Sequence, residues 1–202
     1  MINLFDMEGF LYKISMVLAD IFLLSFLWLI FSIPIITIGA STTAVYYVCT
    51  KKAAESDAYV LKGFLKSFKE NFLISTLSFV SLALVGGGLW INFHALTQVD
   101  LGILQFPARV ALSLVLLQMI FVAMYVFPII SRFNMTVFGA LKSALYLANG
   151  HLLLTISNLV LFATVCIITI WIPFLFIFIP GIFAYFSAIL FVRIFRKHHS
   201  DF

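Results

Sequence analysis

Residues 152–192 read LLLTISNLVLFATVCIITIWIPFLFIFIPGIFAYFSAILFV, a run of 41 residues without a charged side chain. A single straight α-helix of that length would be about 60 Å long, roughly twice the thickness of the hydrocarbon core of a bilayer. The segment must therefore fold back on itself. We expect a turn near Trp171–Pro173 between two membrane spans, over residues 152–171 and 174–194, with a kink at Pro180–Gly181 inside the second.

The composition of the whole chain indicates a membrane protein. Of its 202 residues, 64% are hydrophobic and 10% are charged, against roughly 45–50% and about 25% in soluble domains. So few polar residues cannot cover the surface of a soluble domain, whereas a lipid environment removes that need. The net charge of +4 is then a topology signal, and we expect no nucleic-acid partner.

The rest of the chain predicts three further spans and three amphipathic helices. The spans are expected at residues 14–33, 72–93 and 110–131, because each covers a stretch poor in charge and long enough to cross a bilayer. The amphipathic helices are expected at residues 41–54, 59–71 and 135–148. The fold class is therefore all-α: a polytopic transmembrane bundle of about five spans, in a single integral membrane domain over residues 1–202.

The helix over residues 59–71 has the clearest amphipathic pattern. Leu61, Phe64 and Phe68 recur at helical spacing, while Lys62, Lys66 and Lys69 lie on other faces. We expect this helix to lie in the membrane interface, with its aromatic side chains among acyl chains and its lysines near headgroups. It should run directly into the span at residues 72–93.

Basic residues are distributed unequally between the two predicted membrane faces. One face receives ten of them: Lys51, Lys52, Lys62, Lys66, Lys69, Arg132, Lys142, Arg193, Arg196 and Lys197. The other receives Lys13 and Arg109. The positive-inside rule makes the first face cytoplasmic, so the N-terminus is expected outside and the C-terminus inside. An N-terminal segment that is interfacial or re-entrant is the open alternative.

Motifs typical of enzymes are absent from the sequence. No G-x-x-x-x-G-K-[ST], H-E-x-x-H, C-x-x-C or G-x-S-x-G occurs. We therefore expect no catalytic residues, cofactor or metal. Neutral polar residues within the spans are expected to link helices by hydrogen bonds; they are Ser75, Ser78, Ser81, Asn92, Ser113, Gln118, Thr155 and Asn158.

Two places near the first span are candidates for function. Asp20 is the acid closest to a span interior and could bind a cation, relay a proton or pair with a partner subunit; we favour the simpler interpretation that it faces water at the interface. The stretch 37–43 predicts a helix break and a new start capped by Ser41 or Thr42, with Gly39 permitting the turn. Such a start can bind an anionic substrate, but we favour a structural corner that leads onto the membrane surface.

Four stretches of sequence resemble the YesL-like family of bacterial integral membrane proteins. They are GFLYK at 9–13, LWLIFSIP at 27–34, TIGASTTA at 37–44, and residues 59–72, which include FLKSFKENF. The resemblance implies a multi-pass protein of the bacterial cell membrane without an established biochemical activity. It also implies an accessory role in sugar uptake, because such proteins are typically encoded beside carbohydrate ABC importers and glycan-degrading enzymes in Gram-positive bacteria.

Three functional hypotheses follow. The chain is an accessory or scaffold component of a carbohydrate ABC importer, a transporter or permease subunit in its own right, or a membrane-embedded enzyme; the last is disfavoured for want of a convergent catalytic set. The oligomeric state is left open. The residues nominated for partner docking or substrate contact are Asp20, Gly39, Ser41, Thr42, Lys62, Lys66, Lys69, Arg132 and Lys142.

Overall fold

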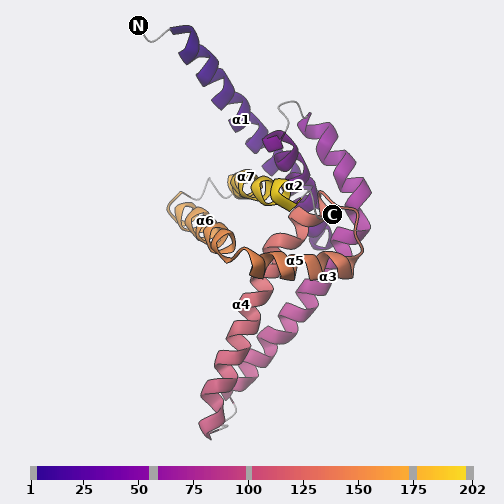
Figure 1. The fold of residues 1–202 in the computed structure, drawn as a ribbon, viewed down its shortest axis with the longest axis vertical. Coiled ribbons are helices and arrows are strands. Elements are labelled where there is room, and N and C mark those ends of the chain that lie inside the picture. The colour runs from indigo at the N-terminus through magenta and orange to yellow at the C-terminus, as the bar shows by residue number, and fades with distance from the viewer. Residues whose placement is uncertain (1–3, 55–58, 99–101, 173–176, 199–202) are drawn as a thin grey trace.

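The computed structural model describes residues 4–54, 59–98, 102–172 and 177–198, and within these ranges the regular elements are helices (Figure 1). The α-helices are α1 (Leu4–Phe31), α2 (Ile38–Ala54), α3 (Val60–Gln98), α4 (Gln105–Ile130), α5 (Val137–Gly150), α6 (Leu152–Trp171) and α7 (Ile179–His198). Short 3₁₀ turns, η1 (Ile35–Thr37) and η2 (Gly102–Leu104), precede α2 and α4. The expected all-α fold class is confirmed.

Four helical segments within the described residues are long and apolar enough to cross a membrane. They are Ile14–Phe31, Val60–Gln98, Gly102–Ile130 and Leu152–Trp171. The apolar part of α7 covers Ile179–Val192, which is only about 21 Å of helix. Four of the five expected spans therefore meet the length requirement, and the protein is a polytopic helical bundle whose long apolar helices are of the membrane type.

Helix α2 is the centre of the bundle, not an interfacial helix. Ten of its residues are buried, and it packs against α1, α3, α4 and α7. The expectation of a surface helix over residues 41–54 is therefore wrong. The reason is the density of small residues: at Gly39 a Cβ atom would lie 2.4 Å from the Ser75 carbonyl oxygen of α3, so only glycine permits this approach.

The break between α1 and α2 also differs from its expected form. Helix α2 begins at Ile38, directly after η1, so Ser41 and Thr42 lie inside it and do not cap it. Their hydroxyls instead donate to the carbonyl oxygens of Thr37 at 3.0 Å and Ile38 at 2.7 Å. The 3₁₀ turn continues into the helix, and the hydroxyls bond back to the preceding turn in the manner of serine and threonine within helices.

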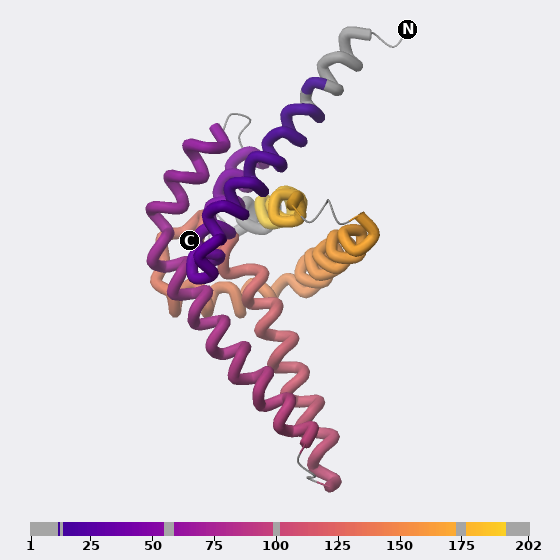
Figure 2. Tube along the Cα trace, turned by 180° about the vertical axis from the view of Figure 1, so that it is seen from behind, coloured from indigo at the N-terminus to yellow at the C-terminus, as the bar shows by residue number. Residues whose placement is uncertain are grey.

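Helix α3 joins the predicted amphipathic segment and the second span in one 39-residue helix, which bends along its length (Figure 2). The expected direct continuation is confirmed. The aromatic face of the segment, however, does not lie among acyl chains. Phe64 is fully buried, and the ring of Phe31 lies 5.3 Å from that of Phe64 and 4.9 Å from that of Phe68.

The C-terminal half follows the prediction with one exception. Helix α5 matches the expected helix at 135–148, with Thr136 as its N-cap accepting from the Gly139 amide at 3.2 Å. Helix α6 ends at Trp171, as expected. Residues 173–176, which include Pro173 of the expected turn and the start of the span expected at 174–194, lie outside the described residues. Pro180 does not kink a span, because α7 begins at Ile179 and places the proline in its first turn. Amide groups there have no intrahelical acceptor, so proline costs nothing.

The molecule is elongated, and the α3–α4 hairpin extends away from the other helices (Figures 1 and 2). The start of α1 lies at one end of the long axis, and the adjoining ends of α3 and α4 lie at the other (Figure 1). In a bundle of five parallel spans, the start of the first span and the end of the second would lie at the same membrane face. The observed arrangement therefore differs from the predicted five-span topology. The side of the membrane on which each lies stays a prediction.

Candidate functional site

Buried polar side chains join α4, α6 and α7 in the interior. The Tyr125 and Thr155 hydroxyls lie 2.8 Å apart, and Thr155 also donates to the Ala148 carbonyl at 2.9 Å. The Ser187 hydroxyl donates to the side-chain oxygen of Asn158. Each of these side chains is at most 3% exposed. Hydrogen bonds between helices hold a membrane bundle together where hydrophobicity cannot.

The expectation that neutral polar residues link helices is confirmed for some and wrong for others. Thr155 and Asn158 form links, as does Ser75, whose hydroxyl lies 2.8 Å from that of Thr43. Ser81, Asn92 and Ser113 instead donate to carbonyls of their own helices. The difference is one of helix face, which residue type alone does not reveal.

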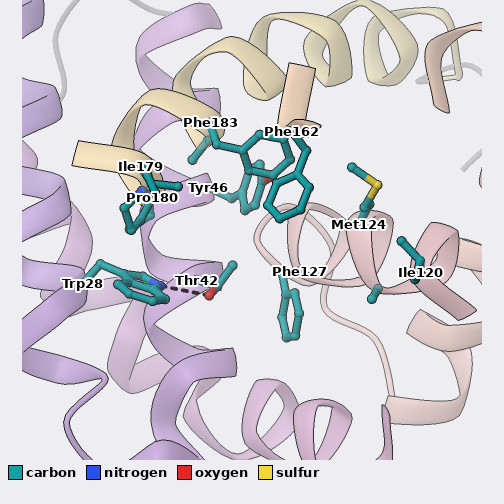
Figure 3. Close-up of a pocket in the computed structure, with 13 residues that line it drawn as sticks. Trp28, Thr42, Tyr46, Ile120, Met124, Phe127, Phe162, Ile179, Pro180 and Phe183 are labelled. Atoms are coloured by element: carbon teal, nitrogen blue, oxygen red, sulfur yellow. Dashed lines mark hydrogen bonds between the residues drawn. The ribbon is translucent and has the colours of Figure 1, made fainter. Parts of the chain in front are cut away.

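An apolar cavity of about 410 Å³ lies beside this network (Figure 3). It is lined by Trp28, Thr42, Val45, Tyr46, Ile120, Ala123, Met124, Phe127, Phe162, Ile179, Pro180, Phe183 and Ala184. The Trp28 indole donates to the Thr42 hydroxyl at 3.0 Å, which satisfies both groups. The lining carries no charge and few polar atoms, so the cavity suits an apolar chain or ring better than a sugar, whose hydroxyls need many partners.

A smaller, basic cavity of about 220 Å³ lies between the end of α2 and the start of α3. It is lined by Tyr47, Val48, Lys51, Tyr59, Lys62, Gly63 and Lys66. Gly63 allows the two helices to approach, since a Cβ there would lie 3.2 Å from the Val48 side chain. The two cavities lie on different faces of α2, one lined by Thr42, Val45 and Tyr46 and the other by Tyr47, Val48 and Lys51.

Asp20 and Arg132, both nominated from the sequence, hold neighbouring elements against the end of α2. Asp20 forms an ion pair with Lys52, and their side chains are 21% and 18% exposed. The interpretation that Asp20 faces water is therefore wrong. Arg132 donates to the Thr50 carbonyl at 2.9 Å, which attaches the turn between α4 and α5 to α2. Both contacts are structural links within the chain.

The structure brings some of the other nominated residues together and separates others. Lys62 and Lys66 share the basic cavity, and Thr42 lines the apolar one. Gly39 and Ser41 are buried in α2. Lys142 lines a third cavity with Phe133 and Tyr146, and exposed Lys69 lines none of these three.

Sequence reasoning missed Lys51, Tyr47 and Tyr59 in the basic cavity and Trp28 and Tyr46 in the apolar one. A signal existed for the first group, because Tyr47 and Lys51 are one helical turn apart, as are Lys62 and Lys66. Placing the two pairs against each other required α2 to pack on α3. The surface-helix interpretation of residues 41–54 excluded that packing.

These features define a polytopic α-helical membrane protein with two cavities on its central helix. Residues 21–93 match a family model described as "Protein of unknown function, DUF624", the family to which YesL-like proteins belong. The match extends from within α1 through α2 into α3 and covers just over a third of the chain. Neither the curated proteins nor the solved structures contain a match to this sequence.

Proposed function

We propose that the protein is a non-enzymatic accessory or scaffold component of a carbohydrate ABC importer in the bacterial cell membrane. The outward face of α5 carries this proposal. Phe138 and Tyr146 are 77% and 72% exposed, and Lys142 lies between them at helical spacing. The opposite face, with Ala140, Ala144 and Ala148, is buried.

The chemistry of this face suits a protein partner at the membrane surface. Exposed aromatic side chains on a helix, flanked by a basic group, are typical of surfaces that bind other proteins. Lys69 of α3 adds a further exposed positive charge. Under the positive-inside rule α5 lies on the cytoplasmic side of the membrane. The nucleotide-binding parts of an importer are accessible from that side. The resemblance to YesL-like proteins supplies the class of partner.

The proposal is tested by a mild-detergent pull-down of the tagged full chain from native membranes. The expected result is recovery of importer subunits at near-equal amounts with the wild type, and their loss with Phe138→Ala/Lys142→Glu. Phe106→Ala is the matched control, because Phe106 of α4 is an aromatic residue as exposed as Phe138 (78%) but lies outside this face, so recovery should be unchanged. Recovery of the chain without importer subunits would overturn the proposal.

A transporter is the second candidate, favoured by the apolar cavity and the polar network beside it. Because the cavity is lined by apolar side chains, the cargo would be an apolar or amphipathic molecule. Liposomes that contain the purified protein should then show flux of such a molecule, and Ala123→Phe should block it by filling the cavity. A membrane-embedded enzyme ranks below both, since no set of acid, base and nucleophile was found in the sequence.

A further inference from the structure

The basic cavity between α2 and α3 is built from two matching pieces of helix. Tyr47, Val48 and Lys51 come from the end of α2, and Lys62, Gly63 and Lys66 come from the start of α3. In both pieces the positions are i, i+1 and i+4, which share one helix face. The helix face of α2 that carries Lys51 therefore opposes the helix face of α3 that carries Lys62 and Lys66, and the small residue Gly63 lies between them.

The charged residues among the described lining of the cavity are all lysines. Among the described residues, Lys51 and Lys62 form no ion pair, and the carboxylate of Glu70 is 4.0 Å from the Lys66 ammonium. That pair is about 60% exposed on both sides, so solvent weakens it. The neighbouring Lys52 is already neutralised by Asp20. Three lysines thus line one cavity, and within the described residues Lys66 is the one that has an acidic partner.

Backbone charge adds to the lysines. Residues 59–66 form the entrance and first two turns of α3, where the positive end of the helix dipole lies. The C-terminal end of α2 carries the negative end of its own helix dipole. The guanidinium of Arg132 donates to the Thr50 carbonyl there, and its positive charge opposes that negative end. Tyr47 and Tyr59 also line the cavity, and a tyrosine hydroxyl can donate a hydrogen bond to an anion.

We propose that this cavity binds a phosphate group. Lysine is a common phosphate ligand, and a helix N-terminus favours the same anion. The volume of about 220 Å³ is below the roughly 300–1,000 Å³ of sites for larger ligands, so it suits a single phosphate and its nearest substituent. The phosphate belongs to an anionic phospholipid headgroup or to a free phosphate-bearing solute, since both present negatively charged non-bridging phosphate oxygens.

The test measures binding to the purified full chain without any partner protein. Native mass spectrometry would compare phosphatidylglycerol with phosphatidylcholine, and thermal unfolding would be followed with inorganic phosphate at increasing concentration. Wild type should bind phosphatidylglycerol preferentially. Lys51→Gln/Lys62→Gln should weaken binding by about 25-fold, taking roughly fivefold for each lysine near a membrane surface.

Lys69→Gln/Lys142→Gln is the matched control, because it removes the same charge outside the cavity. Circular dichroism checks that both variants keep the wild-type helix content. A lipid effect without a phosphate effect identifies the headgroup as the source, whereas phosphate stabilisation that Lys51→Gln/Lys62→Gln abolishes identifies a free solute. Equal weakening of binding in both variants would overturn the proposal. So would the absence of both a preference for phosphatidylglycerol over phosphatidylcholine and a stabilisation by inorganic phosphate. The purified chain is tested without any importer subunit, so this test can fail while the importer pull-down succeeds.

Discussion

Helices α2 and α6 show that the more hydrophobic helix of a membrane bundle is not always the more buried one. Helix α6 consists largely of large apolar residues, yet its buried residues are Thr155 and Asn158. Helix α2 is richer in glycine, alanine, serine and threonine, and ten of its residues are buried. Lipid tails solvate large apolar side chains as well as a protein interior does, so close packing and hydrogen bonds decide which helix becomes central.

The largest effect is expected where α2 approaches α3 most closely. Gly39→Leu would place its Cβ 2.4 Å from the Ser75 carbonyl oxygen and 2.7 Å from the Phe79 Cβ. Overpacking of this kind costs about 3 kcal/mol or more when backbone must move. We expect loss of a monodisperse protein in detergent, measured by size-exclusion chromatography. Gly87→Leu is the control, because nothing lies within 4 Å of its Cβ position; equal damage by both would contradict close packing as the cause.

The ion pair between α1 and α2 should have the next largest effect. Asp20→Asn leaves the Lys52 ammonium without its carboxylate in a place that is 18% exposed. The cost should lie between that of surface pairs and buried pairs, at about 1–2 kcal/mol. A double-mutant cycle with Lys52→Gln, read by thermal unfolding, measures the coupling. The exposed pair Lys66–Glu70 provides the comparison, and a coupling there as large as at Asp20 would be inconsistent with burial as the cause.

A smaller effect is expected where α6 is attached to the bundle. Thr155→Val removes the hydrogen bonds to Tyr125 and Ala148 while nearly preserving shape. Hydrogen bonds between membrane helices contribute about 0.6 kcal/mol on average and up to about 1.7. We expect a loss in that range by thermal unfolding. Ser157→Ala, which removes a bond within α6 alone, should have less effect; the reverse order would argue against Thr155 as the attachment.

The smallest effect is expected on the outer face of α6. Ile170 is 79% exposed, so Ile170→Ala should change the free energy of unfolding by less than about 0.5 kcal/mol. Reconstitution in lipid and thermal unfolding would measure it. A loss of several kcal/mol would mean that a second copy or another protein covers this face, and would remove the contrast between α6 and α2.

The comparison also explains which predictions succeeded. The end of the helix at Trp171, the helix over residues 135–148 and the continuity of residues 59–93 follow from length limits and local chemistry, which neighbouring residues determine. The surface position of residues 41–54 followed from the helix break at 37–43, interpreted as a corner that leads onto the membrane surface. It is wrong because small polar residues pack between helices as well as they face water. Asp20 was expected to face water at the interface, but it pairs with Lys52, a contact that the local sequence does not reveal.

By itself, the sequence determined an all-α membrane protein, because uncharged stretches of twenty residues or more leave the backbone no other way to satisfy its hydrogen bonds in lipid. Only the tertiary structure decided that α2 is central and that Lys51, Lys62 and Lys66 meet at one cavity. Helical periodicity defines the faces of a helix but not the neighbours they meet. That choice depends on how closely two backbones can approach, as at Gly39 and Gly63.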